Sequence, residues 1–313
     1  MIVASVSPLR FREALVLFFR DAPAHRREEN LQWSLDRIAT GEMKTDGLLC
    51  LYDGGAIVGS MFFQVFPDGY VSHWLPEVVG DNLEGEDMLL QDAMRRSEHA
   101  GGRIHQAMLD SDRRFRTDAL LRNGFYHLTR VLNLVRFAGS SLPIPIRPDP
   151  VGAYRIVTPS LRQLAEVREL LPLTHSETLD CAEMNGLQSP DQILAGYRFS
   201  APELSLWKAI ESDCRLVGIM VVSRSADALE LNYLGVLPEY RRRGLAAVLL
   251  AELVDVARLR SLGSISLNVD TRNRPARQLY ESFGFEVAGI QEAFVKVVRQ
   301  GIFEVGSGDP ARL

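Results

Sequence analysis

The stretch Leu231–Leu253, which reads LNYLGVLPEYRRRGLAAVLLAEL, decides the fold of this chain. It begins with apolar and aromatic residues typical of a strand, and Pro238 predicts the end of that strand because proline cannot donate to a ladder. Farther on, apolar residues recur at helical spacing, at Ala247, Leu250 and Val254. A basic turn with one glycine lies between them. The stretch therefore predicts a strand, a turn and a helix in succession.

The turn is suited to an anion. The first amides of a helix have no partner within the helix and carry partial positive charge. Gly244 lets a ligand approach the backbone closely, and Arg241, Arg242 and Arg243 add charge and forked donors that match phosphate. The sequence does not rank these three side chains, so we expect the backbone amides of residues 243–246 to make the main contacts.

Two motifs in this region resemble those of the GNAT superfamily of N-acetyltransferases, and together they cover roughly residues 215–297. Arg241, Gly244 and Ala246 have the spacing of the family's pyrophosphate motif, R/Q-x-x-G-x-G/A. The second signature is similar to a run of residues farther along the chain: Asn273, Ala276, Leu279, Tyr280, Gly284 and Phe285. Both motifs occur in the order and at the spacing typical of the family.

The resemblance implies acetyl-CoA as co-substrate, with no metal. In the family a bulged, splayed strand leaves backbone groups free for the pantetheine arm, and glycine inside a strand is itself a sign of a bulge or a close approach. For Asn273 a helix cap is the alternative role. The residues expected to bind the cofactor are Leu234, Gly235, Val236, Arg241, Arg242, Arg243, Gly244, Leu245, Ala246 and Asn273.

Two residues are expected to move protons. Glu230 lies eleven residues before Arg241, where several family members place a glutamate that deprotonates the amine through water. Asn232 and Tyr233 are alternatives for orienting that water. Tyr280 is the expected acid, because a phenol can protonate a departing thiolate of similar basicity. The alternatives are a surface carboxylate for Glu230 and a core side chain for Tyr280.

The acceptor site is expected in residues 172–190, PLTHSETLDCAEMNGLQSP, because in the family the corresponding segment closes over the acceptor. Long ordered connections often have a function. Asp180, Glu183 and Asn185 are candidates for holding a cationic or polyhydroxylated substrate. The alternative is a solvated loop with a turn at Asn185.

The order of expected elements repeats at a shift of about 160 residues. Asn123-Gly124-Phe125 falls on Phe283-Gly284-Phe285, and AIVGSMFFQV resembles CRLVGIMVVS. We therefore expect an α/β protein of two tandem GNAT-like domains, each a twisted mixed sheet with helices on both faces. Residues 1–137 form the first domain, a Pro-rich linker spans 138–153, and residues 154–313 form the catalytic domain. Within the last domain, residues 285–298 are expected to form a pair of strands.

The two domains differ where the cofactor would bind. The first carries GDNLEGED, residues 80–87, in place of YRRRGLAA. The carboxylates of Asp81, Glu84, Glu86 and Asp87 would repel a pyrophosphate. We expect the first domain to have kept the fold and lost this site. Its acidic loop is either a solvated turn or a site for a cationic partner.

Composition excludes several classes of protein. The 313 residues are 46% apolar and 24% charged with a net charge of −5, which does not favour nucleic-acid binding. No signal peptide or membrane helix is expected. Cys50, Cys181 and Cys214 show neither paired nor metal-ligand spacing, which indicates a reducing, cytoplasmic location.

The predicted function is acetyl transfer from acetyl-CoA to an amine of a small molecule, by direct attack and in the second domain. The tandem layout resembles that of the mycothiol synthases, without implying their substrate. One alternative is a CoA-sensing protein without turnover. Another is a protein or peptide N-acetyltransferase in which the first domain docks the polypeptide. The oligomeric state is open.

Overall fold

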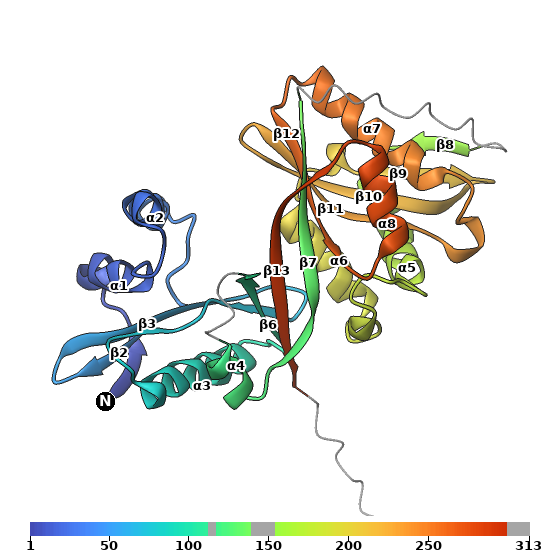
Figure 1. Cartoon of the computed structure of the whole chain (residues 1–313). Helices are drawn as coiled ribbons and strands as arrows, with labels where there is room; N and C mark the ends of the chain where they lie inside the picture. The colour runs from blue at the N-terminus through green and yellow to red at the C-terminus, as the bar shows by residue number, and fades with distance from the viewer. Residues whose placement is uncertain (112–116, 139–153, 299–313) are drawn as a thin grey trace, which may run out of the picture.

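A computed structural model describes residues 1–111, 117–138 and 154–298 (Figure 1). The predicted linker at 138–153 falls, apart from Ala138, outside the described residues. The elements of the first half are β1 (Ile2–Ser5), α1 (Phe11–Phe18), α2 (Ala24–Ala39), β2 (Leu48–Asp53), β3 (Ala56–Val65), β4 (Tyr70–His73), β5 (Glu77–Val78), α3 (Leu83–His99), β6 (Ile104–Asp110), α4 (Asp118–Arg122) and β7 (Tyr126–Phe137). Those of the second half are β8 (Tyr154–Val157), α5 (Leu164–His175), α6 (Pro190–Ser200), β9 (Lys208–Ser212), β10 (Arg215–Ser225), β11 (Ala228–Val236), α7 (Leu245–Leu259), β12 (Ser264–Asp270), α8 (Arg274–Ser282) and β13 (Glu286–Val297).

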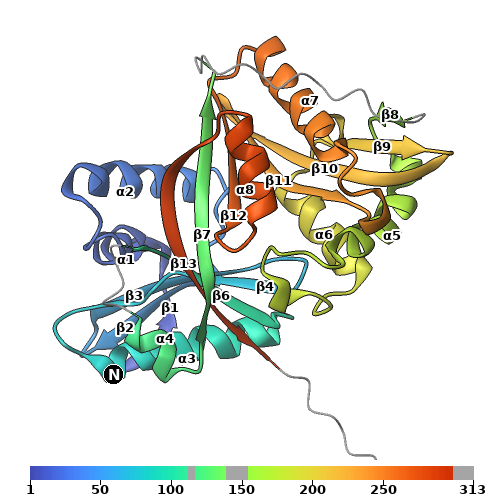
Figure 2. The ribbon, with the colours of Figure 1, turned by 45° about the vertical axis from the view of Figure 1, so that its right-hand side comes forward.

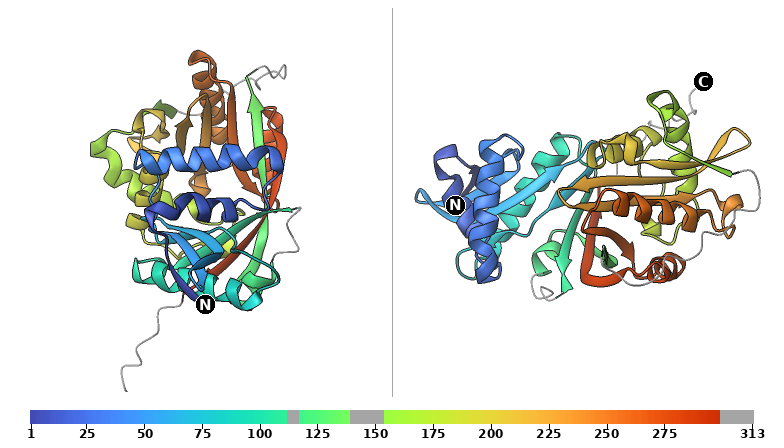
Figure 3. Two further views of the ribbon diagram at one scale, coloured as in Figure 1. Left: turned by 90° about the vertical axis from the view of Figure 1, so that its left-hand side faces the viewer. Right: turned by 90° about the horizontal axis from the view of Figure 1, so that it is seen from above.

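The α/β class with mixed sheets is confirmed. In each half, antiparallel strands are followed by one parallel pair, β4 with β6 and β11 with β12. Helices α1 and α2 lie on one side of β2 and β3, and α3 and α4 lie on the other (Figure 1). In the second half α5 and α6 cover one face of the sheet and α7 covers the opposite face (Figure 3). Amphipathic helices of this kind bury their apolar stripes on a sheet.

The repeat has a local structural counterpart at the ends of α4 and α8. Gly124 and Gly284 both have left-handed backbones, with φ of 80° and 76°. The following amides, of Phe125 and Phe285, donate back to the carbonyls of Leu120 and Tyr280 at 3.0 and 3.1 Å. This is the glycine-terminated helix end that the repeated Gly-Phe pair indicates.

The two halves share strands rather than having separate sheets. Within the described residues, thirteen strands form one sheet whose main path runs β1-β2-β3-β4-β6-β13-β7-β12-β11-β10-β9-β8. The long strand β7 of the first half pairs with β12, and β13 of the second half pairs with β6. The two strands also pair with each other and run side by side between the halves (Figure 2).

The shared strands carry core side chains across the boundary. Leu132 and Leu134 of β7 belong to the apolar core of the second half, whereas Phe294 of β13 belongs to that of the first. The predicted strand pair at residues 285–298 is therefore wrong. No turn interrupts this segment, because its partners are β6 and β7 of the first half, and its pairing with β7 shifts register after Val287 and after Ala293.

A histidine pair lies in the core of the first half. His73 of β4 and His105 of β6 are 4% and 0% exposed, and His73 Nε2 lies 2.8 Å from His105 Nδ1. Burial lowers the pKa of both rings, and the charge of His105 would lower that of His73 further. Both rings are therefore neutral in the folded protein at neutral pH.

This pair is expected to make the protein acid-sensitive. Below about pH 6.5 the histidines of the unfolded chain bind protons, whereas the buried rings of the folded protein stay neutral because their pKa values are lower. The free energy of unfolding should therefore fall as pH drops from about 6.5 toward 4, by up to about 1.4 kcal/mol per pH unit for each ring. Urea unfolding at several pH values measures this slope. The double variant His73→Gln/His105→Gln should reduce this slope, and the variant of an exposed histidine, His25→Gln, should keep it. Equal slopes in the wild type and both variants would contradict the prediction.

Candidate functional site

The basic turn between β11 and α7 has free backbone donors. Arg242 and Gly244 have left-handed backbones, with φ of 62° and 80°, and α7 begins at Leu245 without a side-chain cap. Within the described residues no acceptor is recorded for the amides of residues 242–247. Successive amides in such a turn, at the positive end of a helix, form an anion-binding concavity. We name residues 241–246 the cofactor turn.

The three arginines of the cofactor turn have different surroundings. Arg241 turns inward and donates to backbone carbonyls, including that of Val236 at 3.1 Å. Arg243 donates to Tyr154 Oη at 3.0 Å and lies over the ring of Tyr240. Arg242 is exposed and has no partner among the described residues. The structure thus distinguishes three side chains that the sequence could not rank as anion ligands. Arg242 is the arginine whose guanidinium is available to an anion.

The parallel strands next to this turn diverge. β11 and β12 pair only from Ala228 to Leu231, although β11 continues to Val236 and β12 to Asp270. Beyond that point β11 pairs on its other edge only, with β10. Because antiparallel pairing uses alternate backbone groups, the remaining amides and carbonyls of residues 232–236 face the gap. A linear ligand can bond to this edge in the manner of a strand.

The bulge lies at Asn232, whereas Gly235, which indicated either a bulge or a close approach, is the position of a close approach. Val221 pairs with Tyr233 and Val222 with Leu231, which leaves Asn232 as the extra residue. Its side-chain Oδ1 is buried without a hydrogen-bond partner in the described part of the chain. A glycine is needed at position 235 because a Cβ there would lie 2.3 Å from Tyr233 Oη. The glycine accommodates the tyrosine ring, whose hydroxyl donates to Thr174 Oγ1 at 2.9 Å.

The predicted proton carriers lie on neighbouring elements. Glu230 is half-buried on β11, two residues before the bulge, opposite Ser266 of β12. Tyr280 on α8 is 8% exposed, and its hydroxyl has no partner among the described residues. Burial raises the pKa of Tyr280, and negative charge on Asp180 and Tyr233 raises it further. The hydroxyl therefore keeps its proton at neutral pH.

Asn273 caps a helix, which is the alternative that its position in the sequence left open. Its Oδ1 accepts from the amide of Ala276 at 3.2 Å at the start of α8. This bond fixes the first turn of the helix that carries Tyr280.

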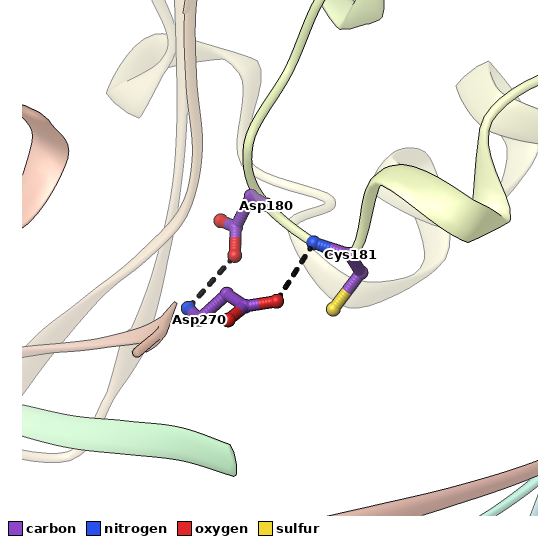
Figure 4. A group of neighbouring side chains, drawn as sticks. All are labelled: Asp180, Cys181 and Asp270. Atoms are coloured by element: carbon purple, nitrogen blue, oxygen red, sulfur yellow. Dashed lines mark hydrogen bonds between the residues drawn. The ribbon is translucent and has the colours of Figure 1, made fainter. Parts of the chain in front are cut away.

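Residues 172–190, which we name the acceptor loop although residues 172–175 form the end of α5 and Pro190 begins α6, are bonded to the end of β12. The amide of Asp270 donates to Asp180 at 2.8 Å, and the amide of Cys181 donates to Asp270 at 3.2 Å (Figure 4). Arg272 joins Asp270 to Glu183, with bonds of 2.7 and 2.5 Å. Two of the three predicted substrate contacts, Asp180 and Glu183, therefore hold the loop itself. Asn185 ends a short helical turn in the same loop.

Asp180, Cys181 and Asp270 also offer potential metal ligands, with ligand atoms all within 4.8 Å of one another (Figure 4). Asp270 is fully buried and is already bonded to Arg272, to Thr129 Oγ1 and to the amide of Cys181. Burial raises the pKa of the Cys181 thiol to about 12, which disfavours the thiolate that metals bind. The donor set fits a loop anchor better than a metal site.

The first half contacts this region through the turn between β3 and β4. Gln188 Nε2 donates to the carbonyl of Asp68 at 3.0 Å. The rings of Phe66 and Phe199 lie 5.7 Å apart, and a Cβ on Gly196 of α6 would come within 2.6 Å of the Asp68 carboxylate. The turn thus packs directly on α6 and on the end of the acceptor loop.

The corresponding helix start in the first half is closed. Asn82 caps α3 by accepting from the amide of Gly85 at 2.9 Å, and Glu84 and Glu86 stand in the first turn. A Cβ on Gly85 would lie 2.6 Å from the side chains of Asn82 and Leu51, so these side chains already cover the glycine. Of the other acidic residues, Asp87 pairs with Arg122 of the same half. Geometry and charge both disfavour a phosphate at this position.

Comparison with known proteins agrees with this geometry. The model of the Acetyltransferase (GNAT) family matches residues 170–285. The N-alpha-acetyltransferase RimI of Mycobacterium tuberculosis is 31% identical over 149 residues, which are 44% of this chain and 92% of that protein. The chain belongs to the GNAT family. It is therefore an acyl-CoA-dependent N-acyltransferase.

Two further similar proteins align with a larger part of this chain than RimI does. The mycothiol acetyltransferase of Brachybacterium faecium is 27% identical over 209 residues, 64% of this chain and 60% of its own length. A tandem GNAT protein from the clavulanic acid biosynthesis pathway aligns with 96% of this chain and 99% of its own, at 12% identity and a TM-score of 0.55. The tandem GNAT fold thus extends over both halves. In the described ranges no helix has the length and apolarity that crossing a membrane requires.

Asp270, Arg272 and Thr174 were not among the residues predicted from the sequence, although they bond to residues 172–190 and to Tyr233. Asp270 directly follows an apolar strand, and this position at the carboxyl end of a parallel strand was the available signal. Thr174 gave no signal, because its partner Tyr233 is 59 residues away.

Proposed function

We propose that the second half of this GNAT protein transfers an acetyl group from acetyl-CoA to an amine of a small molecule by direct attack. The observation that carries the proposal is the row of amides at residues 242–247, which have no acceptor in the described part of the chain, beside the exposed guanidinium of Arg242. It suits the pyrophosphate of CoA. The pantetheine arm would then lie along the free edge of residues 234–236, where β11 has left β12.

The protein groups then take complementary roles. Glu230, through a water molecule, accepts the proton that the ammonium must lose before attack. The amine nitrogen forms the new bond to the carbonyl carbon as the carbon–sulfur bond breaks, and the departing thiolate takes the proton of Tyr280. The proton that the nitrogen loses as the amide forms restores the Tyr280 hydroxyl. The high pKa of Tyr280 holds this proton in place until the thiolate appears. Asn232 Oδ1, which has no hydrogen-bond partner among the described residues, would orient the water or the amine.

A small acceptor is favoured over a polypeptide by the position of the first half. Its turn at residues 66–70 packs on α6 and on Gln188, and so covers one side of the acceptor loop. A peptide would need a groove open at both ends, whereas a small amine needs only a pocket. Competition between short peptides and small amines for turnover distinguishes the two.

Glu230→Gln is expected to lower kcat about 100-fold, because general-base catalysis contributes factors of this size and glutamine cannot accept the proton. Acetyl-CoA binding should be unchanged, since Glu230 lies on β11 before the divergent segment. Steady-state kinetics on a panel of primary amines, with calorimetry for acetyl-CoA, measures both. The exposed Glu239→Gln is the matched control.

Two outcomes would contradict the proposal. A Glu230→Gln enzyme as active as Glu239→Gln would remove the base from its role. Tight acetyl-CoA binding by the wild type, with no turnover of any amine or peptide, would favour a CoA sensor.

A further inference from the structure

The first arginine of the cofactor turn does not face the anion site. Arg241 directs four of its five N–H donors at backbone carbonyls. Nε bonds to Val236 at 3.1 Å, and Nη2 bonds to Thr174 at 3.2 Å and Ser176 at 2.5 Å. Nη1 bonds to Glu177 at 3.4 Å. With these bonds in place the guanidinium has little left to offer a phosphate.

The carbonyls that Arg241 binds belong to two functional segments. Val236 ends the splayed strand beside the cofactor turn, whereas the other three carbonyls mark the end of α5 and the first part of the acceptor loop. One rigid, planar group therefore spans the cofactor side and the acceptor side of the site. Lysine could not do this, because an ammonium has neither the fork nor the reach to hold several carbonyls in a plane.

The rest of the acceptor loop is anchored elsewhere. Asp270 and Arg272 hold its middle at Cys181 and Glu183, and Gln188 bonds to the first half. None of these anchors lies in the cofactor turn. In the described part of the structure, Arg241 is thus the side chain of the cofactor turn that hydrogen-bonds to the acceptor loop. A change in the conformation of the turn would therefore change these bonds.

We propose that Arg241 is a positioning residue that couples the cofactor turn to the acceptor loop, so that CoA bound at the turn orders the loop for the acceptor. The proposal rests on the function proposed above, since it takes CoA as the ligand of the turn. When a pyrophosphate fixes residues 242–247, the backbone of Arg241 is fixed with them, and the guanidinium then holds residues 174–177 in one arrangement. Such coupling is reciprocal, so an ordered loop also favours CoA.

Hydrogen exchange of the loop amides tests this, with coenzyme A alone as the probe. The amides of Thr178 and Cys181 are bonded within the site, to the carbonyl of His175 and to Asp270, and report on loop opening. In the wild type, saturating coenzyme A should slow their exchange by about 5- to 10-fold, the lower range of typical couplings. In Arg241→Gln their exchange should be about 10-fold faster without ligand, and coenzyme A should no longer slow it.

Three variants serve as controls. Arg242→Gln removes the exposed guanidinium and should weaken coenzyme A binding, yet leave the loop protected at saturation. Glu177→Gln removes only an exposed ion pair of 3.8 Å and should change neither quantity. Arg241→Lys keeps the charge and should behave like Arg241→Gln in exchange. Urea midpoints close to that of the wild type confirm that each variant is folded.

The outcomes separate this proposal from the one on which it rests. If Arg241→Gln loses coenzyme A affinity about 10-fold or more while its loop exchanges like the wild type, Arg241 is a phosphate ligand and the coupling is overturned. Coenzyme A binding to the wild type without any change in loop exchange overturns it as well. A wild type that binds no coenzyme A overturns the proposed function, and the coupling with it.

Discussion

Tyr280→Phe is expected to lower kcat about 100-fold while acetyl-CoA still binds. The phenyl ring fills the same buried space on α8 and removes only the hydroxyl, which has no partner in the described residues. The departing thiolate must then take its proton from water. A general acid contributes factors of about 10²–10⁴, so a 100-fold loss, about 2.7 kcal/mol of the barrier, is at the low end. Steady-state kinetics and calorimetry measure the two quantities separately.

Tyr233→Phe is the matched control, because it makes the same chemical change at a neighbouring tyrosine. It breaks the bond to Thr174 Oγ1, which costs about 1 kcal/mol of stability. Its kcat should fall far less than that of Tyr280→Phe. If the two variants lose equal activity, or if Tyr280→Phe stays fully active, Tyr280 is a packing residue and another group protonates the thiolate.

Gly244→Val is expected to raise the Kd for acetyl-CoA about 100-fold. The backbone of Gly244 has φ of 80°, which a β-branched residue tolerates poorly, at a cost of about 1–2 kcal/mol. The turn would relax to a conformation in which the amides of residues 242–247 no longer converge. Because these amides are the main donors proposed for the pyrophosphate, affinity should fall more than stability. Calorimetry with acetyl-CoA and urea unfolding give both values.

Gly80→Val distinguishes the two halves. Gly80 lies in the acidic loop before α3, with φ of 70° and open space where a Cβ would point. The substitution should therefore cost about the same stability as Gly244→Val. Acetyl-CoA affinity should be unchanged, since Asn82 and two glutamates occupy that helix start. Loss of acetyl-CoA binding in Gly80→Val with normal binding in Gly244→Val would assign the cofactor to the first half.

Much of the fold and part of the site could be predicted from short-range patterns. The strand, turn and helix around Gly244 were predictable because glycine, proline and apolar spacing act through local backbone geometry. The exact position of the bulge, at Asn232, could not be predicted, because the sequence showed a glycine at position 235 but not the ring of Tyr233 beside it.

The sequence by itself determined the α/β class, the repeat and the position of the basic turn, because each depends on residues close together in the chain. Only the tertiary structure decided that β7 and β13 are shared between the halves, since strand partners are chosen by cores that lie more than a hundred residues apart. It also decided what Arg241 does. A motif specifies which residue stands at a position, but the carbonyls of Thr174 and Ser176, brought there by α5, fix the direction of its side chain.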